Sequence, residues 1–272
     1  MLIFKGAECR LKCVYWKITE VNNVKSINKI SYDINGLVNT YNIDNVYDQY
    51  KRLEFIEKLN NYIQLQKSDV LEFGSATGQV TEILARTAKR VIAVDGSKDF
   101  IKIAKKRVCD FKNVTFYESY FEDFKLDEKF DCLIMHHILE HIENPVSLLS
   151  NIKEFLNEDG IVMVSVPNAH ALSRQLAVKM GLLSSVYDLT DNDKHHGHYR
   201  VYDWDTLQEQ ITESGFNIIG KHGLSFKLFS DKQNIEMLNL KIIGENQIKG
   251  LWKLGDELSH FAGAIMIVAK VK

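Results

Sequence analysis

The stretch Asp69-Val70-Leu71-Glu72-Phe73-Gly74-Ser75-Ala76-Thr77-Gly78 decides the fold of this chain. Its apolar first half predicts a buried strand, its second half is a turn of small residues, and a helical pattern runs on from Gln79 to Ala88. This order brings backbone N–H groups and a helix N-terminus close to a polar ligand. Glu72 indicates which ligand, because a carboxylate at this place repels a pyrophosphate and suits a ligand that carries an ammonium group.

A second buried strand, Arg90–Asp95, ends in an acid about 20 residues after this turn. In a doubly wound sheet, Asp95 then lies at the carboxyl edge of the neighbouring strand, where it can accept both ribose hydroxyls of a nucleoside. Gly96-Ser97 opens the next helix, with Ser97 as the expected N-cap. A plain turn or cap carboxylate is the alternative role for Asp95.

Together these residues resemble the first motif of the class I S-adenosylmethionine-dependent methyltransferases, acidic-x-Gly-x-Gly-x-Gly. The matching positions are Glu72, Gly74, Ala76 and Gly78, with Ala76 in place of the middle glycine. The resemblance implies S-adenosylmethionine as cofactor, bound by these four residues together with Asp95 and Gly96. It also implies that the loop holding Tyr120, Phe121 and Glu122 covers the adenine ring, and we include His136 among the cofactor-binding candidates.

The rest of the chain repeats the strand–helix order, which predicts a doubly wound, seven-stranded, mostly parallel sheet with helices on both faces. One helix is expected to begin at Asn144-Pro145 and to end at Glu158-Asp159-Gly160, and another covers about Trp204 to Ser214. The further strands are expected at Val114–Tyr117, Phe130–Met135, Ile161–Val166, Gly215–Ile219 and Phe261–Val268. The run 130–168, with Leu139-Glu140-His141 and Val166-Pro167-Asn168, looks similar to the subgroup that contains the ubiquinone-pathway O-methyltransferases.

The resemblance covers roughly residues 44–272, which we interpret as the methyltransferase domain. Residues 1–43 precede it and are expected to form a small flap or cap. Residues 169–202 connect the fifth strand to the next helix. This connection is far longer than the usual 2–6 residues. Because long connections in compact domains are often functional, we interpret 169–202 as a lid over the substrate.

The helix that opens the domain, from about Tyr47, is expected to turn Leu53, Ile56 and Leu59 inward. In related methyltransferases a basic residue and an aromatic of this helix meet the methionine end of the cofactor. Arg52 and Tyr50 are the candidates here, with a solvated charged face as the alternative.

Histidines gather after the fourth strand and in the lid, where they can serve as the base for a hydroxyl acceptor. The catalytic candidates are His137, His141 and His198, and Asn168, His195 and His196 lie in the same regions. Simple capping, packing or solvation of these side chains is the alternative. No metal is assigned. Some methyltransferases of this fold, including small-RNA 2′-O-methyltransferases, bind a divalent cation through Glu-x-x-Glu-His, and the corresponding run is His137-x-x-Glu140-His141.

The composition limits the partners. The 272 residues carry a net charge of −2, which offers no general attraction for nucleic acid or an anionic membrane. No apolar stretch approaches the ~20 residues that span a bilayer, and no signal-peptide pattern is evident, so we expect a cytoplasmic protein. We therefore expect a methyltransferase for a small-molecule acceptor, at oxygen rather than nitrogen. The alternatives are an NAD- or nucleotide-sugar-binding Rossmann enzyme and a non-catalytic protein that keeps the fold.

Overall fold

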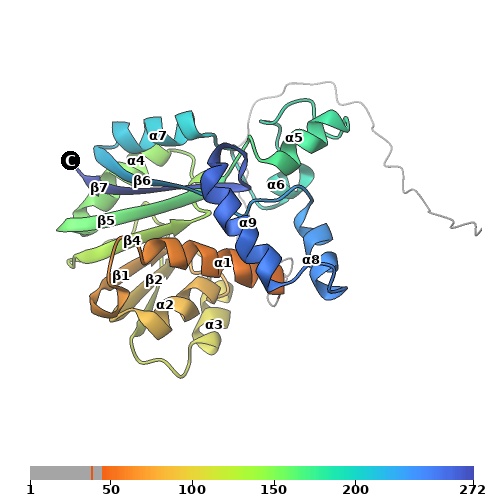
Figure 1. Cartoon of the computed structure of the whole chain (residues 1–272). Helices are drawn as coiled ribbons and strands as arrows, with labels where there is room; N and C mark the ends of the chain where they lie inside the picture. The colour runs from red at the N-terminus through yellow and green to blue at the C-terminus, as the bar shows by residue number, and fades with distance from the viewer. Residues whose placement is uncertain (1–37, 39–44) are drawn as a thin grey trace, which may run out of the picture. The chain divides into compact units, whose positions relative to one another are not determined.

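The computed structural model describes Val38 and residues 45–272, and residues 1–37 and 39–44 are not described. The predicted flap, residues 1–43, lies outside the described residues apart from Val38. The described residues all fall within one compact unit, Asp33–Lys272 (Figure 1).

A seven-stranded sheet in the order β3-β2-β1-β4-β5-β7-β6 forms the centre of this unit. The strands are β1 (Asp69–Phe73), β2 (Arg90–Asp95), β3 (Val114–Glu118), β4 (Phe130–His136), β5 (Leu156–Pro167), β6 (Phe216–Leu224) and β7 (Ala264–Val271). The pairs among β1 to β5 are parallel, whereas β7 runs antiparallel to both β5 and β6. The predicted fold, a mostly parallel seven-stranded sheet between helices, is confirmed.

The helices cover both faces of the sheet, as Figure 1 shows. They are α1 (Val46–Leu59), α2 (Gln79–Thr87), α3 (Lys98–Arg107), α4 (Pro145–Asn151), α5 (Leu172–Lys179), α6 (Asp191–His195), α7 (Trp204–Glu213), α8 (Asp231–Asn239) and α9 (Glu245–Glu257), with short 3-10 turns at Leu65–Lys67, Leu139–His141, Ile152–Phe155 and Ser259–Phe261. Alternate strand residues enter two cores: Leu133 and Met135 of β4 pack with α4 and α7, while Cys132 and Ile134 pack with α1 and α2. Because both faces of the sheet are covered, both need apolar side chains, and the strands are therefore continuous apolar runs in the sequence.

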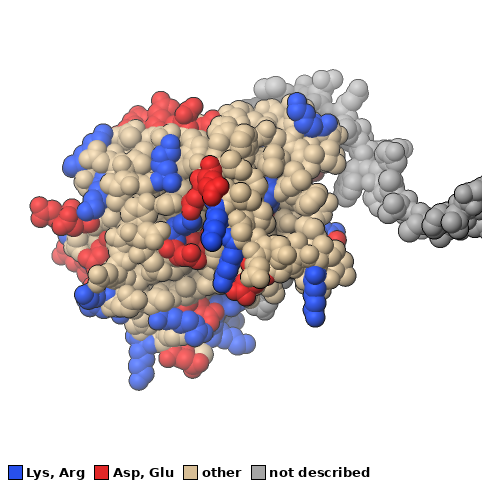
Figure 2. All heavy atoms as spheres, in the orientation of Figure 1, with Lys and Arg blue, Asp and Glu red and all other residues tan. Residues whose placement is uncertain are grey.

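The sheet topology positions the ligand crevice. The strand order reverses between β1 and β4, and the carboxyl ends of parallel strands meet at one edge, where open α/β sheets bind their ligands. The turn after β1 and the histidines after β4 both lie at this edge. Figure 2 shows acidic and basic side chains interspersed over much of one face, in line with the near-neutral net charge. Among the described residues, none of the helices is long and apolar enough to cross a membrane.

Two predicted details of the helices are wrong. The helix that begins at Pro145 ends at Asn151 and passes through a 3-10 turn, because the chain already enters the sheet at Leu156, which pairs with Phe130. In α1, Ile56 and Leu59 are buried as predicted, but Leu53 is 45% exposed. The inward face of α1 carries Tyr47, Glu54 and Phe55 instead, and this face lies opposite Leu53 around the helix.

The segment between β6 and β7, residues 225–263, holds α8 and α9, which the sequence analysis did not identify. A sequence signal exists: Ser230 and Gln233 form a capping box, with each side chain bonding the other residue's backbone N–H. Ile248 and Trp252 of α9 pack against Tyr47 of α1. This insertion therefore covers the first helix of the domain.

Candidate active site

The turn after β1 depends on backbone that favours glycine. Gly74 has φ +86°, and a Cβ there would lie 2.1 Å from Ile138 Cδ1. Gly78 has φ +81°, and its Cβ would lie 2.8 Å from the Cα of Ala104 in α3. Ala76, in place of the family's middle glycine, keeps the same left-handed region with φ +43°. These contacts bring β1, α3 and the chain after β4 together around the turn.

Asp95 closes the other side of this turn. One carboxylate oxygen accepts a hydrogen bond from the Ala76 N–H at 2.8 Å, and the other accepts one from the Ser97 N–H at 2.9 Å. Burial raises the pKa of Asp95, and these two hydrogen bonds oppose the rise. Each carboxylate oxygen has a second lone pair, so ribose hydroxyls can bind in addition to the backbone. Ser97 is the N-cap of α3, as predicted.

Glu72 is buried at the end of β1, where Thr81 Oγ1 donates a hydrogen bond to its Oε2 at 2.7 Å. Burial raises the pKa of Glu72 to about 8, and the charge of Asp95 adds to the rise. A ligand ammonium or sulfonium nearby would favour the ionised carboxylate. With a pKa of about 8, Glu72 is mostly protonated at neutral pH, and a bound cation would be needed to ionise it.

The three residues predicted to cover adenine differ in position. The Phe121 ring stacks on Phe73 of β1, with centroids 5.0 Å apart and planes 14° apart. Tyr120 and Glu122, on either side of it, are exposed. Phe121 therefore lies next to the Gly74 turn, and the other two point toward solvent.

His136 is the last residue of β4. Its Nδ1 lies 2.7 Å from Ser165 Oγ of β5, and its ring packs at 4.3 Å against Phe55 of α1. Burial lowers the pKa of His136 well below its usual range, and the neighbouring His137 and Arg52 add to this effect. A neutral imidazole at this position leaves the adjacent space available to a cationic ligand.

The next turn gathers the predicted catalytic histidines around one carboxylate. His137, with φ +57°, places Nδ1 3.1 Å from Oε1 of Glu140, which is fully buried. Ligand atoms of Glu140, His141 and His198 all lie within 4.8 Å of one another. The structure thus brings together the three histidines that the sequence analysis selected.

Electrostatics make Glu140 the charged member of this cluster. Burial would raise its pKa, but the hydrogen bond from His137 and the nearby His141 and His198 lower it below the usual value. Burial lowers the pKa of His141, whose ring lies edge-on to His198 with centroids 4.7 Å apart. Glu140 Oε2 has no hydrogen-bond partner among the described residues. A carboxylate oxygen left in this state can accept from a ligand or hold a cation.

The predicted lid is attached to this cluster by backbone hydrogen bonds. The Tyr199 N–H donates to the Glu140 carbonyl at 2.8 Å, and Arg200 Nη2 donates to the Glu143 carbonyl at 3.0 Å. His198 Nδ1 lies 3.2 Å from Asp193 Oδ1, and Asp193 also pairs with Arg174. These contacts explain why His198, which is far from Glu140 and His141 in the sequence, completes the cluster.

Of the other candidates from the sequence, His196 lies at the edge of the cluster, with its ring centroid 6.3 Å from that of His198, and the rest have partners elsewhere. His195 is exposed, and His196 bonds the Asn192 carbonyl of its own turn. The Asn168 carboxamide instead bonds backbone groups of His170, His260 and Ala262, so it clamps the chain after β5. Tyr50 packs edge-on against Trp252 of α9, with centroids 6.4 Å apart.

Comparison with known proteins identifies the family. A family model described as a methyltransferase domain matches residues 47–221. The chain belongs to this methyltransferase family. It is a class I S-adenosylmethionine-dependent methyltransferase, which confirms the predicted cofactor and decides against the NAD-binding and non-catalytic alternatives.

The relatives of this methyltransferase differ in their acceptors. A ubiquinone biosynthesis O-methyltransferase of Rickettsia canadensis is 24% identical over 77% of this chain and 82% of its own length. A malonyl-[acyl-carrier protein] O-methyltransferase of Bacillus cereus is 33% identical over 38% of this chain and 39% of its own. The solved structure of a possible histamine N-methyltransferase from Thermotoga maritima shares the fold, with a TM-score of 0.59, 18% identity, and 88% and 98% of the two chains covered.

Proposed function

We propose that the methyltransferase acts on a hydroxyl group of a small-molecule acceptor, bound beneath the lid 169–202. The supporting observation is the cluster of His137, Glu140, His141 and His198 at the carboxyl end of β4. A sulfonium methyl is already electrophilic, so its displacement depends mainly on placing the acceptor. A hydroxyl acceptor also has to lose a proton, which is the task of a histidine base near neutral pH.

His137 is the base in this proposal. With a proton on Nδ1 donated to Glu140 Oε1, Nε2 has a free lone pair for the acceptor. Its side chain is 39% exposed, so an acceptor can reach it, whereas Glu140 is buried behind it. His141 and His198 flank the same carboxylate and orient the acceptor. The cofactor is held by Glu72, Gly74, Ala76, Gly78, Asp95, Gly96, Phe121 and His136, and the exposed Tyr120 and Glu122 border its adenine ring from the solvent side.

The test is the pH dependence of the methyl-transfer step in single-turnover experiments. Replacing His137 by Gln should lower the rate about 10²–10⁴-fold and remove the acid limb of the profile. His195→Gln, an exposed lid histidine outside the cluster, is the matched control and should behave as wild type. An acid limb that persists in the His137, His141 and His198 variants would show that none of them is the base and would favour an amine acceptor.

The cluster also supports a second candidate, a divalent cation held by Glu140, His141 and His198. The observations in its favour are that ligand atoms of the three residues lie within 4.8 Å of one another and that no described residue bonds Glu140 Oε2. One carboxylate with two imidazoles suits zinc, iron or manganese better than magnesium. A bound cation would make an acceptor hydroxyl more acidic. Activity that a chelator abolishes and one of these ions restores would support it, and unchanged activity after complete metal removal would exclude it.

A further inference from the structure

A group of four half-buried charged residues joins the β6–β7 insertion to the first helix of the domain. Lys51 Nζ of α1 lies 2.5 Å from Asp48 Oδ1 and 2.9 Å from Asp231 Oδ2 at the start of α8. Lys227, four residues before Asp231, pairs with the other oxygen of the same carboxylate. Two ammonium groups therefore share Asp231, and we call Asp48, Lys51, Lys227 and Asp231 the lysine site.

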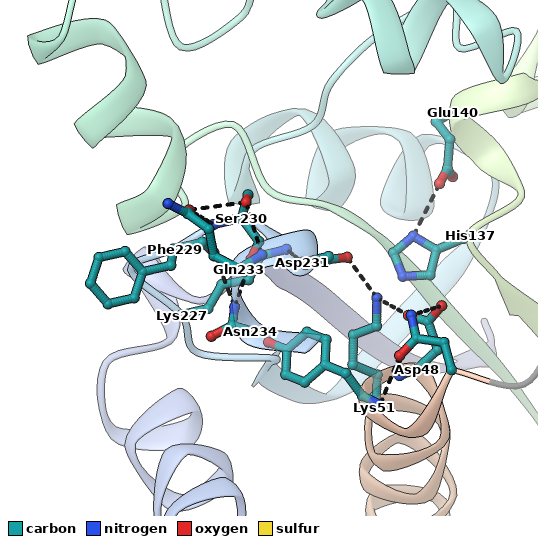
Figure 3. Close-up of polar contacts among 12 residues, drawn as sticks. Asp48, Lys51, His137, Glu140, Lys227, Phe229, Ser230, Asp231, Gln233 and Asn234 are labelled. Carbon is teal, nitrogen blue, oxygen red and sulfur yellow. Dashed lines mark hydrogen bonds and ion pairs between the residues drawn. The ribbon is translucent and has the colours of Figure 1, made fainter. Parts of the chain in front are cut away.

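The lysine site lies at the ligand edge of the sheet. A Cβ at Gly263 would lie 3.2 Å from Lys227 Cε, and the Gly263 carbonyl accepts from the N–H of Asn168, directly after β5. Burial lowers the pKa of His136, the last residue of β4, and the positive charge of Lys51 adds to this shift, which places Lys51 near the end of β4. In the view of Figure 3, His137 lies between Glu140, to which it is bonded, and the group of Lys51, Asp48 and Asp231. The lysine site therefore borders the same crevice as the catalytic cluster.

A lysine that is largely removed from water needs a paired negative charge, which Asp231 supplies to both lysines here. The side chains of Lys51 and Lys227 keep only 24% and 18% of their exposure, whereas Asp231 keeps 39%. The shared carboxylate is thus the most accessible member of the site. An incoming anion can replace Asp231 on one ammonium group while Asp231 stays paired with the other. Both lysines then keep a negative partner, which a charge removed from water requires.

The position in the sequence indicates which ligand the lysine site serves. The family model ends at residue 221, so Lys227 and Asp231 lie outside the part of the chain that matches the shared domain. A shared domain binds the shared cofactor, whereas added segments that reach the crevice are free to select the acceptor.

We propose that Lys227 and Lys51 bind an anionic group, a carboxylate or a phosphate, of the methyl acceptor. The acceptor thus spans the crevice, with its anion on the lysine site and its reacting group at His137. Without the acceptor, the Asp231 carboxylate pairs with both lysines. The acceptor anion displaces it from one of them. This inference rests on the proposed function in placing the reacting group, but the anion site can be tested separately.

Binding of two simple probes, inorganic phosphate and benzoate, tests the site in protein saturated with S-adenosylhomocysteine at constant ionic strength. Wild type should bind at least one probe saturably, and the tighter probe identifies a phosphoryl or a carboxylate acceptor. Lys227→Met should weaken binding about 10- to 100-fold, the scale of a lost charge-assisted hydrogen bond. Lys232→Met removes the same charge from an exposed position in α8 and should change nothing.

Asp231→Asn separates ligand binding from a purely structural ion pair. With its competing charge removed, probe binding should become tighter, whereas a latch needed only for folding would lose binding in both the Lys227 and Asp231 variants. Thermal melts show that each variant is folded under the assay conditions. No saturable binding in wild type, or weaker binding in folded Asp231→Asn, would overturn the proposal.

Two further measurements distinguish a wrong assignment of the lysine site from a wrong assignment of the hydroxyl acceptor. If Lys227→Met weakens the binding of S-adenosylhomocysteine itself about 10- to 100-fold, the lysine site binds the cofactor's own carboxylate and the acceptor assignment is wrong. If hydroxylated acceptors are not methylated while probe binding follows these variants, the lysine site stands and the hydroxyl assignment fails. Among methylated acceptors, a carboxylate should outperform its carboxamide analogue in kcat/KM, and Lys227→Met should abolish that preference.

Discussion

Single residues with left-handed backbone shape the turn after β1, where we expect the cofactor to bind. Gly74, Ala76 and Gly78 all have positive φ, which only glycine adopts without strain. The motif Glu72–Gly78 could be recognised from the sequence because its residues are adjacent and each is needed for the local geometry of the turn. The sequence did not show that Ala76 takes the same backbone conformation or that its N–H bonds Asp95.

Gly78→Ala should destabilise the fold and weaken S-adenosylhomocysteine binding. The new Cβ would lie 2.8 Å from the α3 backbone, and the alanine would also be strained by the positive φ. Together these effects should lower the free energy of unfolding by about 2–5 kcal/mol. Gly181→Ala is the matched control, because Gly181 has φ +73° but no atom within 4 Å of its Cβ. It should lose only the strain, about 1–2 kcal/mol, in urea denaturation. Equal losses in the two variants would show that the contact with α3 is unimportant.

At the scale of elements, local patterns predicted the strands better than the segments around them. The apolar runs of β1, β2 and β4 begin where the sequence indicated, because burial on both faces leaves a continuous signature. Periodicity did not determine which side of α1 faces the sheet, so Leu53 was placed wrongly. Nor could any local pattern show that Lys51 meets Asp231, which is 180 residues away.

Shortening the lid should separate acceptor turnover from cofactor binding. Replacing residues 180–185 by a short glycine linker removes exposed Met180 and Leu182 and leaves the Tyr199 and Arg200 attachments in place. If this segment is a lid that excludes water and confines the acceptor, turnover should fall while affinity for S-adenosylhomocysteine changes little. Single-turnover kinetics and calorimetry measure the two quantities. Loss of cofactor binding with acceptor binding retained would contradict the assignment of 169–202 as a substrate lid.

At the scale of the whole molecule, buried carboxyl groups make stability depend on pH. Burial raises the pKa of Glu54 to about 8 from 4.5, and its Oε2 accepts from the Ser225 N–H beside the β6–β7 insertion. The folded state keeps this proton where the unfolded state loses it. The stabilisation is therefore complete below pH 4.5 and is lost as the pH rises through 8.

Glu54→Gln, a neutral replacement of similar shape, should remove this dependence. Its free energy of unfolding should exceed that of wild type near pH 9, and the difference should shrink toward about pH 5. Glu57→Gln, on the exposed side of the same helix, is the matched control and should show no such trend. Urea denaturation at several pH values measures both. A constant difference across pH would show that Glu54 is ionised in the folded protein.

The strand order brings the Gly74 turn, Asp95 and the histidines after β4 to one edge of the sheet, and we expect this edge to bind S-adenosylmethionine through Asp95. Calorimetric titration of S-adenosylhomocysteine and NAD into wild type and Asp95→Ala tests it most directly, with thermal melts to confirm that the variant is folded. Wild type should bind S-adenosylhomocysteine and not NAD, and Asp95→Ala should lose about 1–3 kcal/mol of binding free energy, as expected when ribose hydroxyls lose a buried partner. Equal affinity of wild type and folded Asp95→Ala, or tighter binding of NAD, would contradict the account.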